Sequence, residues 1–126
     1  MAHVWSFCSI LRPEEADASA PEIGRLPEKF LYVANQLWAH KDHAGAFRAL
    51  GLLQRRGLDV ALVCTGRQAD PRWPGHWAEL ERLIASEGIA GRVHMLGLVP
   101  RNVQIEIFRR AAAVLQPSLF EGWSTV

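Results

Sequence analysis

The chain has 126 residues, of which 49% are hydrophobic and 21% charged, and its formal net charge at pH 7 is +1. This is the size of one domain and the composition of a folded globular protein, because disordered chains contain fewer apolar residues. A net charge so close to zero excludes steering toward nucleic acid or an anionic membrane by a bulk electrostatic field.

The cellular setting follows from the apolar runs and the cysteines. No apolar run approaches the roughly 20 residues of a membrane-spanning helix, and the N-terminus lacks the pattern of a secretion signal. Cys8 and Cys64 both lie in predicted strands. We expect both cysteines to act as small buried apolar residues in a protein of a reducing compartment, and not to form a disulfide or a metal site. The sequence therefore predicts a cytoplasmic protein.

The beginning of the chain has the pattern of a boundary between domains. Residues 4–11 are rich in aromatic and branched side chains, which favours a strand. Residues 12–27 contain three prolines, several acids and small residues, which is typical of a linker. We therefore predict an interdomain crossing strand and linker over residues 1–24, and the main domain over residues 25–126.

Strand and helix patterns alternate through the main domain. Short apolar runs at residues 30–34, 59–65, 93–96 and 111–115 predict four strands. The runs at 30–34, 59–65 and 111–115 are typical of buried strands. Segments with helical apolar spacing separate them. Such alternation predicts an α/β fold, a Rossmann-like parallel sheet with right-handed crossovers and helices on both faces.

Local end signals place the three helices. The first begins after Asp42, a plausible N-cap, and ends at Gly57. The second ends at Gly88, and the third runs from Pro100 to Arg110. The side chains expected to face inward are Ala46, Phe47, Leu50, Leu53, Trp77, Leu80, Leu83, Ile84, Val103, Ile107 and Phe108.

Polar residues follow the predicted strands, where ligands bind in open α/β sheets. Glu121, after the last strand, suits contacts with sugar hydroxyls or with developing positive charge; alternatively it complements the dipole of a helix predicted from Trp123. Lys41, after the first strand, suits a diphosphate leaving group, although its local sequence favours a solvated lysine. Gly66 and Gly97 either admit a ligand or simply make turns.

Other binding chemistries find little support in the sequence. His40 and His43 flank Asp42, but no second cluster completes the three or four ligands of a zinc site, so we expect no metal. The tryptophans do not interleave with a basic stripe, so we expect no nucleic acid. The two commonest nucleotide motifs, the P-loop and G-x-G-x-x-G, are missing.

Four segments together resemble one family. Residues 116–126 (QPSLFEGWSTV) resemble the donor-site motif of glycosyltransferase family 4 (group 1), retaining enzymes of the GT-B fold whose signature is Glu, seven residues, Glu. Residues 35–43 (NQLWAHKDH) resemble its phosphate-contacting loop, and residues 64–66 and 93–97 have the matching order and spacing. The resemblance covers about residues 25–126.

The resemblance implies roles for single residues. Lys41 would contact the donor diphosphate and Glu121 would hold the donor sugar, so these two form the implied catalytic pair. Many members carry an arginine shortly before the lysine, where this chain has Asn35 and Gln36. The implied donor-binding residues are Asn35, Gln36, Thr65, Gly66, Leu96, Gly97, Leu98, Ser118, Gly122, Trp123, Ser124 and Thr125.

The resemblance also implies a fragment. The second signature glutamate would fall beyond Val126, and the N-terminal acceptor domain is missing. We expect the donor-binding part of a retaining enzyme that transfers a hexosyl group from a nucleoside-diphosphate sugar to a glycan or lipid-linked acceptor. The fragment would be inactive alone, would need no cofactor besides the donor, and the full protein would associate peripherally with a membrane. Two alternatives stay open: a sugar-nucleotide epimerase of the same fold and a non-catalytic nucleotide-binding module.

Overall fold

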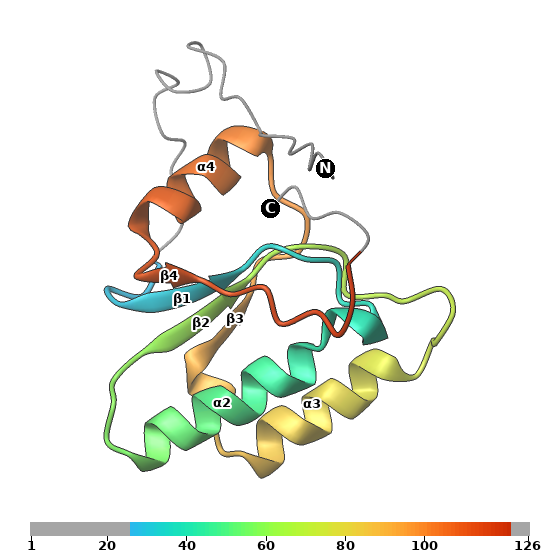
Figure 1. Cartoon of the computed structure of the whole chain (residues 1–126), viewed down its shortest axis with the longest axis horizontal. Coiled ribbons are helices and arrows are strands. Elements are labelled where there is room, and N and C mark those ends of the chain that lie inside the picture. Colours follow the sequence, from blue (N-terminus) through green and yellow to red (C-terminus); the bar gives the residue numbers. More distant parts are fainter. Residues whose placement is uncertain (1–25, 122–126) are drawn as a thin grey trace, which may run out of the picture.

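The computed structural model of the chain describes residues 26–121 (Figure 1). The strand predicted at residues 4–11, most of the linker and the helix predicted from Trp123 lie outside this range. The elements, in chain order, are β1 (Phe30–Val33), the 3₁₀ helix η1 (Ala39–Lys41), α2 (His43–Arg55), β2 (Ala61–Cys64), α3 (His76–Ser86), the 3₁₀ helix η2 (Ala90–Arg92), β3 (Val93–Met95), α4 (Arg101–Arg110) and β4 (Ala113–Val114).

The four strands form one parallel sheet in the order β3-β2-β1-β4. In register, Leu31 of β1 lies beside Leu62 of β2 and Ala113 of β4, and Leu62 lies beside Val93 of β3. Helices α2 and α3 cover one face of the sheet and α4 covers the other (Figure 1). The predicted Rossmann-like α/β fold is therefore confirmed.

Each face of the sheet has its own hydrophobic core. Alternate residues of β1 point to opposite faces, as the pleat of a strand requires. The core under α2 and α3 contains Val33, Leu37, Ala46, Phe47, Leu50, Val60, Leu62, Cys64, Leu80 and Ile89. The core under α4 contains Phe30, Tyr32, Ala61, Val63 and Ile107. Each fully buried large side chain contributes about 1.5–3 kcal/mol of hydrophobic free energy.

The helix ends lie where the local signals predicted them. The Asp42 carboxylate accepts a hydrogen bond of 3.0 Å from the Gly45 N–H and so caps α2. Gly57 and Gly88, with φ of 76° and 68°, follow the ends of α2 and α3. Within the described residues, no helix has the length and apolar character needed to cross a bilayer.

The prediction that residues 111–115 form a buried strand is wrong in its burial. Strand β4 comprises only Ala113 and Val114, both are exposed, and Val114 keeps 42% of its surface accessible. The reason is strand order, because β4 is the last strand and pairs only with β1 within residues 26–121. An apolar run shows which residues can be buried but not where their strand lies in the sheet.

Candidate functional site

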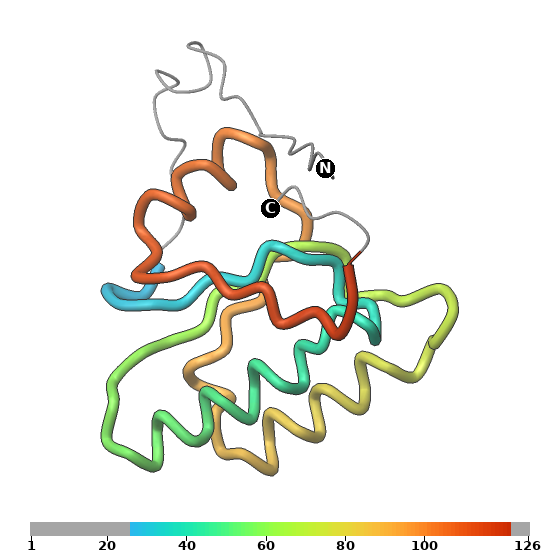
Figure 2. Tube along the Cα trace, in the orientation of Figure 1, coloured from blue at the N-terminus to red at the C-terminus, as the bar shows by residue number. Residues whose placement is uncertain are grey.

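Polar residues gather at the carboxyl edge of the sheet, where the strands end. The segments after β1 and β4 run beside each other there (Figure 2). One backbone hydrogen bond joins them, because the Leu119 N–H donates to the His40 carbonyl at 2.9 Å. The ring of His40 stacks on that of Phe120, with 5.0 Å between centroids. Two segments far apart in the sequence therefore form one surface.

Lys41 and Glu121 meet across these two segments. The Lys41 ammonium donates to Oε1 of Glu121 at 2.6 Å, and their side chains are only 15% and 25% exposed. Lys41 is the last residue of η1, a short turn that the sequence did not predict. The structure thus brings together the two residues to which the family resemblance assigns catalysis.

A chain of amide hydrogen bonds supports this pair. Gln116 donates from Nε2 to Oε1 of Glu121 at 2.9 Å, and Asn35 donates from Nδ2 to Oε1 of Gln116 at 2.8 Å. Asn35 is only 5% exposed. Gln116 belongs to the quoted motif, but sequence reasoning gave it no role, because its partner Asn35 is distant in the sequence.

The surroundings of Glu121 keep it ionised. The hydrogen bond from Lys41 lowers the pKa of the Glu121 carboxyl below its ordinary value, and the Lys41 charge acts in the same direction. The site therefore offers an ionised carboxylate beside the Lys41 side chain. A carboxylate can accept hydrogen bonds from sugar hydroxyls, and an ammonium can neutralise a phosphate oxygen.

Gln36 and Gly66 hold together the three loops that follow β1, β2 and β3. The Arg67 N–H donates to Oε1 of Gln36 at 2.6 Å, and the Gly66 N–H donates to the Gly97 carbonyl at 2.8 Å. A Cβ on Gly66 would collide with the carbonyl oxygen of Asn35, and its φ of 121° disfavours any other residue. Close packing of the loops thus explains this glycine without a ligand.

A small hollow of about 90 Å³ lies between these loops. The Thr65 hydroxyl is directed away from solvent, because Thr65 is only 3% exposed and its Oγ1 lies 2.6 Å from the buried Tyr32 hydroxyl. Leu96 and Leu98 are exposed at the same edge. The residues that line this carboxyl-edge hollow are Ala34, Asn35, Gln36, Thr65, Gly66, Leu98, Val99 and Gln104.

The remaining candidate residues differ in where they lie. Gly122, Trp123, Ser124 and Thr125 lie outside the described residues. His43 is fully buried, whereas His40 is half-buried and stacks on Phe120. In residues 26–121, no group of three or more His, Cys, Asp or Glu side chains could hold a metal ion. Cys64 is a free buried thiol, and burial raises its pKa to about 12.

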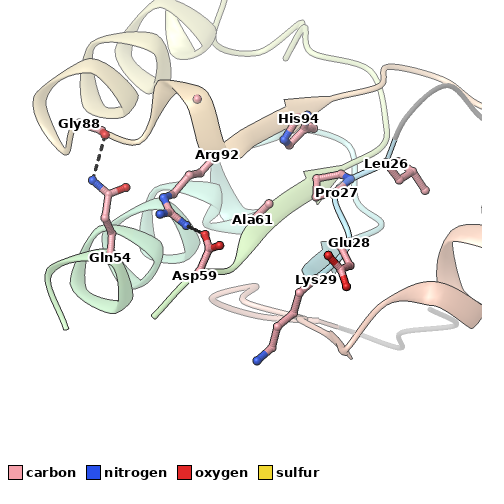
Figure 3. Close-up of a pocket in the computed structure, with 11 residues that line it drawn as sticks. Leu26, Pro27, Glu28, Lys29, Gln54, Asp59, Ala61, Gly88, Arg92 and His94 are labelled. Carbon is pink, nitrogen blue, oxygen red and sulfur yellow. Dashed lines mark hydrogen bonds and ion pairs between the residues drawn. The ribbon is translucent and has the colours of Figure 1, made fainter. Parts of the chain in front are cut away.

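A larger hollow of about 1050 Å³ lies at the opposite, amino edge of the sheet (Figure 3). It is lined by the residues before β1 and by Asp59, Arg92 and His94, among others. Arg92 donates to Asp59 at 2.6 Å, but the Asp59 side chain is 95% exposed. None of the candidate residues lies in this amino-edge hollow, which is at the edge away from the usual ligand side of a parallel sheet.

The parallel sheet, its crossovers and the polar cluster at its carboxyl edge define a Rossmann-like α/β protein. Residues 16–126 match the family described as glycosyl transferases group 1, and the chain belongs to that family. The family and the fold that the sequence resemblance implied are both confirmed. A comparison with curated protein sequences gave no match.

Solved structures show the same fold at low sequence identity. Sucrose-phosphate synthase from Thermosynechococcus elongatus is 17% identical, with a TM-score of 0.61 over 79% of this chain and 25% of that chain. HepE from Anabaena, crystallised with UDP, is 20% identical, with a TM-score of 0.62 over 74% of this chain and 24% of that one. OtsA in its apo form is 19% identical, with a TM-score of 0.62 over 91% of this chain and 28% of that one. The chain thus spans about a quarter of the length of these structures.

Proposed function

We propose that the chain binds the donor substrate of a retaining glycosyltransferase, which transfers a hexosyl group from a nucleoside-diphosphate sugar to a glycan or lipid-linked acceptor. The observation that carries the proposal is the ion pair between Lys41 and Glu121 at the carboxyl edge of the sheet. Membership of the glycosyl transferases group 1 family supports it. The similarity to HepE, which was crystallised with UDP and with UDP and glucose, supports a nucleotide-sugar donor.

The pair would have separate tasks once the donor binds. Phosphate oxygens would replace the Glu121 carboxylate beside the Lys41 ammonium, which then stabilises the charge of the leaving nucleoside diphosphate. The released carboxylate would accept hydrogen bonds from sugar hydroxyls and orient the sugar. The acceptor would attack from the face that the diphosphate leaves, so the configuration at the sugar carbon is retained.

The proposal assigns only part of an enzyme to this chain. We propose that the acceptor site belongs to the rest of the intact protein and that the chain alone does not turn over. The proposed reaction uses no cofactor, and the nucleoside-diphosphate sugar is its donor substrate. A cytoplasmic location and peripheral contact of the intact protein with a membrane belong to the same proposal.

The proposal is tested by Glu121→Ala in the intact protein. Loss of the carboxylate that orients the sugar should lower turnover on the order of 100-fold, with little change in the melting temperature. The matched control is Glu81→Ala, which removes an exposed carboxylate on α3, away from the edge. NMR of the product anomer reports whether configuration is retained.

The same experiment separates the alternatives. Wild-type turnover in the Glu121→Ala protein would contradict the assignment. If the wild-type intact protein binds nucleotide but transfers no sugar, and Glu121→Ala leaves its nucleotide affinity unchanged, a non-catalytic binding module is favoured. Conversion of the donor to its epimer by the wild-type protein would favour an epimerase.

A further inference from the structure

The loop between β2 and α3 folds back onto η1 through one buried carboxylate. Asp70 is only 3% exposed, and its Oδ2 accepts a hydrogen bond of 3.1 Å from the N–H of Ala39, which lies 31 residues away in sequence. Its Oδ1 accepts hydrogen bonds from the N–H and Nε of Arg72, at 3.0 and 3.3 Å. A buried carboxylate is costly unless such donors surround it.

Asp70 is charged in this setting. Burial by itself would raise the pKa of the Asp70 carboxyl, but hydrogen bonds from the backbone N–H groups of Arg72 and Ala39, together with the Arg72 guanidinium, hold it below its ordinary value. The hydrogen bond to Ala39 is therefore charge-assisted, and such bonds are about twice as strong as neutral ones.

Arg72 extends the contact along η1. Its guanidinium lies 5.0 Å from the centre of the Trp38 ring, and its Nη2 lies 3.4 Å from Nδ1 of His40. Asp70 and Arg72, which we call the bracket, thus contact three consecutive residues, Trp38, Ala39 and His40.

The bracket matters because η1 is too short to hold its own shape. It has three residues, and Trp38 at its N-cap makes no side-chain capping hydrogen bond. A 3₁₀ turn of this length has weak internal hydrogen bonds and needs outside support. The residue that follows the bracketed three is Lys41, whose N–H donates to the Trp38 carbonyl at 2.8 Å.

We infer that Asp70 is a positioning residue, which with Arg72 fixes η1 so that the Lys41 ammonium points into the carboxyl-edge site. The inference rests on the proposed function for what Lys41 binds, a nucleoside diphosphate. A misplacement of a catalytic group by about 1 Å can lower the reaction rate on the order of 100-fold. The backbone that carries Lys41 therefore has to be held in position.

The test is a double-mutant cycle between Asp70→Ala and Lys41→Ala in the intact protein. Affinity is measured for UDP, ADP and GDP, and the tightest ligand is used throughout. Asp70→Ala alone should weaken binding about tenfold, and the effect should vanish in the Lys41→Ala background, because Asp70 acts through Lys41. Asp70→Asn, which keeps one acceptor oxygen, should recover part of the loss.

Two further variants complete the design. Asp59→Ala is the matched control, because it removes a carboxylate in a 2.6 Å ion pair at the other edge of the sheet, and it should leave affinity unchanged. If Asp70→Ala does not fold, Arg72→Gln takes its place in the cycle, because it removes the guanidinium contacts with Trp38 and His40 and keeps the hydrogen bond from Ala39 to Asp70. Its loss of affinity should likewise vanish in the Lys41→Ala background, and an equal loss there would overturn the inference.

The outcomes separate the inference from the proposed function. If Asp70→Ala lowers the nucleotide affinity equally in the wild-type and Lys41→Ala backgrounds, the inference is overturned, since equal losses indicate a general effect on stability. If the wild-type protein binds none of the three diphosphates, the proposed function fails. Hydrogen exchange at the Ala39 and Lys41 amides then decides the positioning role: faster exchange in Asp70→Ala but not in Asp59→Ala supports it, and unchanged exchange overturns it.

Discussion

The two edges of the sheet differ in the size of their hollows and in the burial of their ion pairs. The amino edge has the larger hollow, about 1050 Å³ against about 90 Å³ at the carboxyl edge. Both edges carry an ion pair with a 2.6 Å contact. At the carboxyl edge, however, the paired side chains are 15% and 25% exposed, whereas at the amino edge they are 31% and 95% exposed. Size alone therefore does not identify the site, and converging, partly buried polar groups are the better guide.

Backbone packing distinguishes the edges most strongly. Gly66→Ala at the carboxyl edge should lower the free energy of unfolding by about 2–3 kcal/mol, because the new Cβ meets the Asn35 carbonyl at a φ of 121°. Gly91→Ala at the amino edge has open space around it and should change stability by less than about 0.5 kcal/mol. Chemical denaturation measures the free energy of unfolding of both variants. Equal losses would show that backbone packing does not distinguish the two edges.

The charged pairs should differ in ligand binding. Lys41→Ala should weaken the affinity for a nucleoside diphosphate by about 2 kcal/mol, or about thirtyfold, while leaving the affinity for the uncharged nucleoside unchanged. Arg92→Ala at the amino edge should alter neither. Isothermal titration with UDP and with uridine provides the comparison, and a loss of UDP binding in Arg92→Ala would move the site to the other edge.

The buried histidine His43 should make the stability of the fold depend on pH. His43 is fully buried at the start of α2, and burial, followed by the neighbouring His76, lowers its pKa from 6.5 to about 4. As the pH falls, the unfolded chain takes up this proton at a higher pH than the folded chain does, so protonation favours unfolding. The stability that depends on a neutral His43 is therefore complete above about pH 6.5 and is lost as the pH falls toward 4. The free energy of unfolding should therefore fall by about 2 kcal/mol between pH 7 and pH 5.

Substitution assigns that pH dependence to its source. His43→Leu should flatten the stability profile between pH 7 and pH 5, since an apolar side chain fills the same buried position without titrating. A slope that survives in His43→Leu would show that another group controls acid unfolding.

The smallest effect is expected for the amino-edge ion pair. Asp59→Ala should change the free energy of unfolding by less than about 0.5 kcal/mol, because an ion pair with a 95% exposed carboxylate is screened by water. Thermal unfolding at low and high salt measures this contribution. A larger, salt-dependent loss would mean that the amino edge carries more of the fold's stability than its exposure indicates.

Local signals were enough to predict most of the fold. Asp42, Gly57 and Gly88 mark helix ends through contacts or backbone angles that involve only nearby residues. The apolar runs that became β1, β2 and β3 have the composition of buried strands whatever their neighbours are. Strand-end positions also drew attention to Lys41 and Glu121, since the carboxyl ends of parallel strands meet at one edge.

The sequence by itself thus determined the class of fold, the ends of its helices and the edge where Lys41 and Glu121 would lie. Only the tertiary structure decided that β4 is an exposed strand at the edge of the sheet within residues 26–121 and that the Thr65 hydroxyl faces Tyr32. It also decided that Gln116 contacts Glu121 and that Asp70 contacts η1. The physical reason is the range of the interactions. Capping and periodicity act over one or two helical turns, whereas Lys41 and Glu121 are 80 residues apart and meet only after the sheet has formed.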